Sequence, residues 1–117
     1  MHELSITRNI VAIVSEHARG RPVRRVRLQI GKLSAIMPDA IRFCFDLCVA
    51  GTLLAGARLE IEEPPGLAHC AACGAAVKLT LPTGSCPRCK ADALRLSGGE
   101  EMLIKEIELD MEGASCA

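Results

Sequence analysis

The chain has 117 residues, no net charge at neutral pH, no Trp or Tyr, and only two Phe. This length allows one ordinary domain with at most a small additional module, and the lack of a basic surface or aromatic platforms argues against nucleic-acid binding. No apolar run approaches the ~20 residues of a membrane span and no secretory segment is visible, so we expect a soluble, cytoplasmic protein that binds no membrane.

The first predicted element is an amphipathic helix. Its apolar residues recur at every fourth position, at Ile6, Ile10, Val14 and Ala18. A helix with this period buries one face against a core. Ser5 is the expected cap at its start, and Gly20 followed by Pro22 is expected to end it.

A strand and a second helix follow. Val26, Leu28 and Ile30 alternate with polar residues, the period-two pattern of a strand with one buried face, and Gly31 closes it. The second helix is expected to open at Pro38 and end at Gly51. Its apolar stripe consists of Ile41, Cys44, Phe45, Cys48 and Val49.

A second strand is expected where Ala57, Leu59 and Ile61 alternate with charged residues, up to the stop at Pro64-Pro65-Gly66. Those prolines mark a boundary, and Ser97-Gly98-Gly99 marks the next one. Between the two boundaries lies a cysteine-rich segment, which we therefore expect to be inserted between two strands of one sheet.

The inserted segment contains two Cys-x-x-Cys pairs, Cys70/Cys73 and Cys86/Cys89. Each two-residue gap lets both sulfurs of a pair reach one ion from a tight turn, and four thiolates suit a tetrahedral metal with Zn–S near ~2.3 Å. The spacer is slightly shorter than in typical zinc ribbons, but a hairpin with Val77–Leu81 as one strand can close it. The pattern predicts a structural zinc site.

Other readings of the four cysteines remain open. Disulfides fit poorly with an odd cysteine count, seven in all, and with a reducing compartment. Iron is not separated from zinc by spacing alone. A redox dithiol would place one pair at a helix start, whereas these pairs sit in Gly- and Pro-marked turns. A nucleotide deaminase would need a His-x-Glu partner, which the chain lacks.

A last strand is expected from Met102 to Met111, with a bulge or register change at Leu103–Lys105, where the alternation breaks. Outward-facing Arg25 and Arg27 of the first strand, together with the acidic side chains at 106 and 108, suggest that the first and last strands are neighbours. A solvated charged surface explains the same residues equally well.

The remaining cysteines and histidines receive simpler interpretations. Cys44 and Cys48 lie one turn apart on an apolar stripe and are assigned to the core. Cys116 is expected to be an exposed thiol in a tail. His17 is interpreted as a partly exposed helix residue. His69 adjoins Cys70 and is interpreted as lying outside the ligand set, where it could couple the module to pH.

The first three residues form a second candidate metal site. The α-amine of Met1, the backbone nitrogen of His2 and its imidazole can close successive chelate rings around one ion, and the backbone nitrogen or carboxylate of Glu3 can fill a fourth position. Square-planar nitrogen and oxygen ligands suit Ni(II) or Cu(II). The alternative is an ordinary solvated terminus, with Glu3 favouring the helix dipole.

Several segments together resemble the HypA/HybF family of hydrogenase nickel-incorporation proteins, nearly from end to end. They are Met1-His2-Glu3-Leu4-Ser5-Ile6, Phe43-Cys44-Phe45 with Gly51-Thr52-Leu53, Gly56-Ala57-Arg58-Leu59, the four cysteines, and Gly99-Glu100-Glu101. The N-terminal Met-His-Glu in company with the four-cysteine module is the most specific of these.

The resemblance implies a non-enzymatic metallochaperone that carries Ni(II) weakly at its N-terminus, keeps Zn²⁺ in a separate structural site, and passes nickel toward the [NiFe]-hydrogenase large subunit. It also implies a HypB-type GTPase partner, while the sequence leaves homodimer formation and service to urease open. The alternative is a zinc-ribbon adaptor that binds protein or nucleic acid without nickel.

The predicted fold is α+β. Two helices pack on a small mixed three-stranded sheet, and a four-cysteine zinc ribbon is inserted in it. We expect residues 1–64 and 99–117 to form the nickel-binding domain and residues 65–98 to form the zinc-binding domain.

Overall fold

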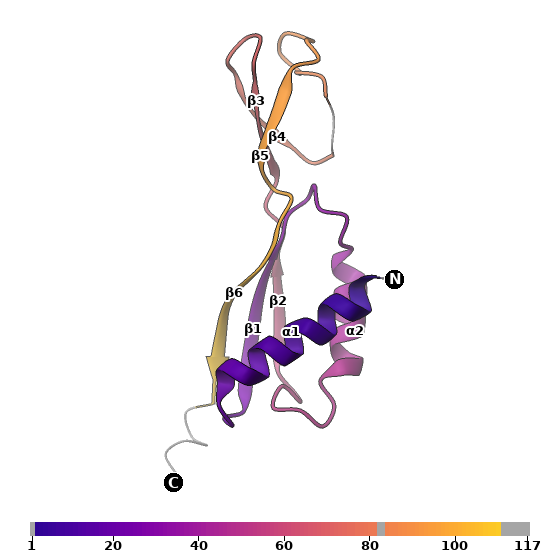
Figure 1. Ribbon diagram of the computed structural model, residues 1–117, viewed down its shortest axis with the longest axis vertical. Helices are drawn as coiled ribbons and strands as arrows, with labels where there is room; N and C mark the ends of the chain where they lie inside the picture. Colours follow the sequence, from indigo (N-terminus) through magenta and orange to yellow (C-terminus); the bar gives the residue numbers. More distant parts are fainter. Residues whose placement is uncertain (1, 82–83, 111–117) are drawn as a thin grey trace. The chain divides into compact units, whose positions relative to one another are not determined.

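The structure is a computed structural model that describes residues 2–81 and 84–110. Neither of the helices found there is long and apolar enough to cross a membrane. The elements follow the order α1 (His2–Ala18), β1 (Val23–Ile30), α2 (Pro38–Cys48), β2 (Arg58–Glu62), β3 (Gly66–Cys70), β4 (Ala76–Leu79), β5 (Leu94–Gly98) and β6 (Met102–Leu109) (Figure 1).

β1 is the central strand of a three-stranded sheet with the order β2-β1-β6. β1 and β2 run in parallel, because the N–H of Val23 at the start of β1 donates to the carbonyl of Leu53 before β2, and the N–H of Lys32 donates to that of Pro64 beyond it. The buried side chains of β1 are Val23, Val26, Leu28 and Ile30, and the last three follow the predicted alternation.

β6 runs antiparallel to β1. The N–H of Gly31 donates to the carbonyl of Glu101 at one end, and the N–H of Asp110 donates to that of Pro22 at the other. The sheet is therefore mixed, and the expected adjacency of the first and last strands is confirmed.

Ion pairs across this sheet follow the predicted charge pattern. The Arg25 guanidinium lies 3.2 Å from Glu108 and 3.5 Å from Glu106 on β6, and 3.3 Å from Glu60 on β2. Arg27 lies 3.0 Å from Glu106. Each pair is partly exposed and contributes at most about 1 kcal/mol, but together the pairs favour this strand order over arrangements that would place like charges side by side.

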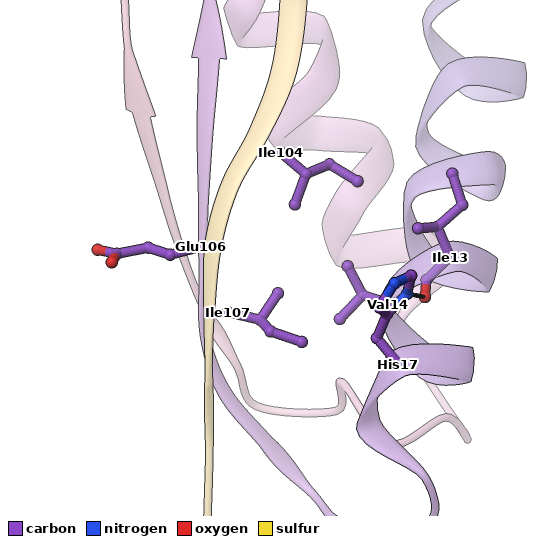
Figure 2. A pocket seen from close by; sticks show the side chains of 6 residues that line it. All are labelled: Ile13, Val14, His17, Ile104, Glu106 and Ile107. Carbon is purple, nitrogen blue, oxygen red and sulfur yellow. Dashed lines mark hydrogen bonds between the residues drawn. The ribbon is translucent and has the colours of Figure 1, made fainter.

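The β6 side chains do not alternate strictly. Ile104 and Ile107 both point toward α1, whereas Glu106 points away from it (Figure 2). A strict period of two would place Ile104 and Glu106 on one face. The predicted bulge or register change at Leu103–Lys105 stays a prediction, and the observed change of phase falls between Ile104 and Ile107.

The first helix begins earlier than predicted. α1 includes His2, so Ser5 is an exposed residue inside the helix and not its cap. The prediction was wrong because the first turn places little apolar surface in the core, and the hydrophobic period alone does not reveal it. The rest of the pattern is confirmed, since Ile10, Val14 and Ala18 are buried, and Gly20 with a φ of +83° follows the last turn.

α2 begins at Pro38, which occupies the first helical position, and packs against α1. Ile41 and Phe45 are buried on its inner face. Cys44 and Cys48 are only half-buried, so they lie at the edge of the core rather than inside it as expected.

The cysteine-rich segment forms a second antiparallel sheet with the order β4-β3-β5, between β2 and β6 in sequence. The expected hairpin strand Val77–Leu81 is present but spans Ala76–Leu79. The sequence pattern does not predict β3 and β5, because Gly66 and Gly98 are residues typical of a stop and a boundary, yet both lie inside strands.

The described chain forms two compact units. The helix unit contains residues 2–28, 36–61 and 104–110, and the cysteine unit contains residues 29–35 and 62–103. The assignment of residues 1–64 with 99–117 to nickel and 65–98 to zinc stays a prediction.

Three connecting segments of the cysteine unit meet at glycines. A methyl group on Gly31 would overlap the backbone of Gly99, one on Gly99 would overlap the backbone of Gly66, and one on Gly66 would overlap the side chain of Leu33. Gly99 also has a φ of +89°, which side chains rarely allow. Glycine is therefore required here by close approach of the chain to itself.

This contact predicts that Gly31→Ala destabilises the protein by about 1–3 kcal/mol, as expected for overpacking. Urea unfolding followed by circular dichroism measures the loss. Gly98→Ala is the matched control, because its added methyl would meet nothing closer than the Leu67 Cδ1 at 3.6 Å. Equal stability of the two variants would contradict the assignment.

Candidate metal centres

The first cysteine pair lies in a tight turn after β3. The N–H of Cys70 donates to the carbonyl of Ala75 (2.9 Å), and the N–H of Gly74 donates back to the carbonyl of Cys70 (2.8 Å). Gly74 has a φ of +76°, which glycine adopts without steric cost. The turn brings Cys73 back beside Cys70.

The second pair repeats this turn without a strand before it. The N–H of Cys86 donates to the carbonyl of Ala91 (2.8 Å), and the N–H of Lys90 donates back to the carbonyl of Cys86 (2.8 Å). Lys90 takes the place of Gly74 and has a φ of +67°. A left-handed lysine is an uncommon conformation, and the repeated hydrogen-bond pattern explains why it is tolerated.

Each turn also directs a backbone N–H at the sulfur of its first cysteine. The N–H of Cys73 lies 3.5 Å from the Cys70 Sγ, and the N–H of Arg88 lies 3.4 Å from the Cys86 Sγ. Such donors favour the thiolate form, which is the form that binds metals.

The four sulfurs have the spacing of a tetrahedral site. Cys70 Sγ and Cys89 Sγ are 3.7 Å apart, Cys73 Sγ and Cys86 Sγ are 3.8 Å apart, and all four lie within 4.8 Å of one another. A tetrahedron with Zn–S bonds of ~2.3 Å has edges of about 3.8 Å. The donor set therefore fits Zn²⁺ in size and in chemistry.

The thiol pKa values differ around the cluster. Backbone N–H donors, those of Cys89 first and Arg88 after it, lower the pKa of Cys86 to about 6, and the Cys73 N–H likewise lowers the pKa of Cys70. The Ala91 N–H acts to lower the pKa of Cys89, but burial and the neighbouring sulfurs raise it to about 11. Protein groups alone thus leave some of the sulfurs protonated, and a divalent cation would deprotonate all four.

The other candidate residues stay outside this cluster. Within residues 2–81 and 84–110, the four cysteines are the one group of at least three His, Cys, Asp or Glu side chains that could hold an ion. His69 is exposed on β3 between buried neighbours, and its ring is not part of the group. Its expected pH coupling stays a prediction, and Cys116 lies outside the described residues.

His17 forms a local contact and lines an apolar hollow. Its Nδ1 bonds the carbonyl oxygen of Ile13 one turn earlier at 2.9 Å (Figure 2). The hollow of about 200 Å³ is bordered mainly by Ile13, Val14, Ile104 and Ile107. The side chain is exposed where the pattern predicts a partly exposed residue, and His17 belongs to no candidate ligand group among the described residues.

The N-terminal candidate site lies in the first turn of α1. His2 is exposed, and Met1 lies outside the described residues. The Glu3 carboxylate accepts a hydrogen bond from the N–H of Met37 (3.1 Å), the residue that precedes α2. Hydrogen bonds from the chain's amino terminus and from Met37 lower the pKa of Glu3 to about 2. No sequence pattern predicts this link between the two helices, since Met37 lies in a loop.

Comparisons with known proteins agree along most of the chain. A family model described as "Hydrogenase/urease nickel incorporation, metallochaperone, hypA" matches residues 1–109. The hydrogenase maturation factor HypA of Nostoc punctiforme is 61% identical over 110 residues, covering 94% of this chain and 96% of that protein. The HypA of Geobacter sulfurreducens is 44% identical and is covered over 100% of its length.

Solved structures show the same fold. The solution structure of the Ni metallochaperone HypA from Helicobacter pylori superposes with a TM-score of 0.63 at 25% identity, over 93% of this chain and 97% of that one. A second solution structure, of a HypA protein, gives a TM-score of 0.67 at 26% identity and covers 93% of this chain and 96% of its own.

The cluster geometry predicts that Cys73→Ala abolishes metal binding by the cysteine unit and unfolds β3–β5, because three thiolates cannot complete the tetrahedron. The helical circular dichroism signal should remain. Elemental analysis and a thermal melt measure both effects. Cys44→Ala is the matched control, since it removes a half-buried thiol from α2, outside the cluster. Unchanged metal content and melting in Cys73→Ala would contradict the prediction.

Proposed function

Since the chain belongs to the HypA family of nickel-incorporation metallochaperones, we propose that it binds Ni(II) at its N-terminus and delivers it to [NiFe]-hydrogenase during maturation. Proteins of this family are maturation factors rather than enzymes. A carrier of this kind must hold its ion firmly enough to select it and loosely enough to release it.

The proposed nickel ligands are the α-amine of Met1, the backbone nitrogen and imidazole of His2, and Glu3. The helical start of α1 supports this set, because the first N–H groups of a helix have no carbonyl partner within the helix. A metal can replace protons there without breaking the backbone ladder. The torsion ψ sets the angle between the backbone nitrogen of one residue and that of the next. In a helix ψ is about −42°, so successive backbone nitrogens lie on the same side of the Cα–C bond. An extended chain would turn them apart.

The position of Glu3 favours its backbone nitrogen over its carboxylate as the fourth donor. The carboxylate already accepts the N–H of Met37 and thereby holds the first turn of α1 against the start of α2. Carboxylate ligation would have to displace that bond. We therefore assign Glu3 the task of positioning the terminus through its side chain while it binds nickel through its backbone.

The four-cysteine cluster is proposed to hold a structural Zn²⁺. The sulfur spacing and the backbone donors support zinc. Zn²⁺ binds well to thiolates, whereas the site proposed for nickel is rich in nitrogen ligands. Binding of such an ion contributes about 10–16 kcal/mol of apparent free energy in zinc-finger peptides, enough to determine whether a small unit folds.

The partners follow from family membership. The chain is proposed to act with the hydrogenase maturation machinery, including a HypB-type GTPase that supplies nucleotide energy and the hydrogenase large subunit that receives nickel. The family description also names urease. Homodimer formation and cytoplasmic location stay predictions.

Nickel titration by calorimetry tests the proposal, with zinc-loaded protein that carries a native, untagged N-terminus. We expect one Ni(II) per chain, weaker binding as the pH falls because the ligands must lose protons, and loss of binding in His2→Ala and in a version with one residue added before Met1. His17→Ala is the matched control, because it removes an exposed histidine from the same helix.

If all these proteins bind nickel alike, nickel sits elsewhere, and a zinc-ribbon adaptor becomes the better description. Zinc content is the control for folding. If every variant retains zinc, a loss of nickel binding reports loss of the nickel site and not unfolding of the protein.

The assignment of Glu3 makes a separate prediction. Glu3→Gln should keep its nickel affinity, because the amide oxygen can still accept the Met37 N–H and the backbone nitrogen is unchanged. Glu3→Ala should weaken binding by freeing the first turn. The same calorimetric titration measures both, and loss of nickel in Glu3→Gln would instead show that the carboxylate is a ligand.

A further inference from the structure

The four cysteines of the cluster are not equivalent. Cys70 and Cys86, the first of each pair, have no exposed surface, whereas Cys73 and Cys89, the second of each pair, are exposed. The buried sulfurs also receive the backbone N–H bonds described above. Each turn therefore combines one protected sulfur with one that solvent can reach.

The exposed sulfurs open onto a common hollow of about 390 Å³. Cys73 and Cys89 line it together with Gly74, Ala75 and Arg88, and neither buried cysteine takes part. A small oxidant that enters this hollow therefore meets Cys73 and Cys89 first. Arg88 also lines this hollow, beside the two exposed sulfurs.

The contacts between sulfurs pair each exposed cysteine with the buried cysteine of the opposite turn. Cys89 Sγ is 3.7 Å from Cys70 Sγ, and Cys73 Sγ is 3.8 Å from Cys86 Sγ. We propose that the cluster is a site of oxidative modification by peroxide, in which Cys73 and Cys89 are attacked and the disulfides Cys70–Cys89 and Cys73–Cys86 form, with release of the metal.

Each step balances with hydrogen peroxide as the oxidant. The exposed thiolate takes up one peroxide oxygen to become a sulfenic acid and releases hydroxide. The buried thiolate of the opposite turn then attacks that sulfur, forms the S–S bond and releases a second hydroxide. Two protons from solvent convert both hydroxides to water. Two peroxides oxidise all four thiolates, and the zinc ion leaves as Zn²⁺ without changing its oxidation state.

Disulfides between the two turns and disulfides within each Cys-x-x-Cys pair would leave the cysteine unit linked in different ways. A bond between Cys70 and Cys89 joins the turn after β3 to the turn before β5, so the two turns remain tied when the metal is gone. Bonds within each pair would leave them separate. The proposed oxidation therefore exchanges a metal crosslink for a covalent one, which reduction and zinc can reverse.

The experiment treats zinc-loaded and metal-free full-length Cys116→Ser protein with stoichiometric hydrogen peroxide, followed by trapping of free thiols and trypsin digestion. A chromogenic chelator follows the release of zinc. Trypsin separates the cysteines into convenient peptides, namely 43–58 with Cys44 and Cys48, 59–78 with Cys70 and Cys73, 79–88 with Cys86, and 89–90 with Cys89. Fragmentation of the linked peptides distinguishes Cys70 from Cys73.

We expect peptide 59–78 linked to both 79–88 and 89–90, with Cys70 joined to Cys89 and Cys73 to Cys86, and zinc release in step with disulfide formation. A disulfide inside 59–78 together with a link between 79–88 and 89–90, a Cys70–Cys86 bond, or first oxidation in 43–58 would each overturn the proposal. Retention of zinc through two equivalents of peroxide would overturn it as well.

The test also separates this inference from the proposed zinc site. If the purified protein holds no zinc, the zinc assignment fails, while the metal-free arm still reports the disulfide pattern. A brief treatment with iodoacetamide gives a second measurement that does not depend on peroxide, because alkylation should label Cys73 and Cys89 before Cys70 and Cys86. Equal labelling of all four would contradict the inequality on which the proposal rests.

Discussion

Four cysteine sulfurs within 4.8 Å of one another are the constraint on which the cysteine unit depends. Its described buried apolar residues are few, and two of them are ligand cysteines: Ile30, Ala68, Cys70, Leu79 and Cys86. So small a core cannot offset the conformational entropy of the turns and strands around it. A cation bound at the centre of the sulfurs, as proposed, would supply the missing stabilisation at the two hydrogen-bonded turns. The same thiolates make this unit sensitive to oxidants.

The helix unit is stabilised in a different way. Its core is an apolar layer between two helices and one face of a mixed sheet, while the opposite face is covered by arginine and glutamate pairs centred on Arg25. The exposed start of α1 is the proposed site of the transported nickel, which would have no structural task there. In the proposed function, a structural and a transported metal would use ligand sets of different chemistry, sulfur for one and nitrogen for the other.

Fidelity of nickel delivery then depends on how the terminus is held. The Glu3 carboxylate ties the first turn of α1 to the backbone just before α2. Ordering the ligands beforehand reduces the entropy lost when the ion binds. It also gives a partner protein a defined surface from which to take or supply nickel.

The sequence by itself determined the types of most elements and the presence of a four-cysteine cluster that fits a metal ion. Periods of four and two identified α1, β1 and α2, and the spacing of the two cysteine pairs identified a tetrahedral site, because both signals come from residues close together in the chain. Other features were decided only by tertiary structure. The start of α1 at His2 lies outside the apolar pattern, and β3 and β5 are too short and too punctuated by glycine to be seen alone. Three further features depend on residues far apart in sequence. They are the contact among Gly31, Gly66 and Gly99, the Glu3–Met37 hydrogen bond, and the difference between the buried and the exposed cysteines. Local patterns cannot encode which distant segments meet, since that is set by how the whole chain packs.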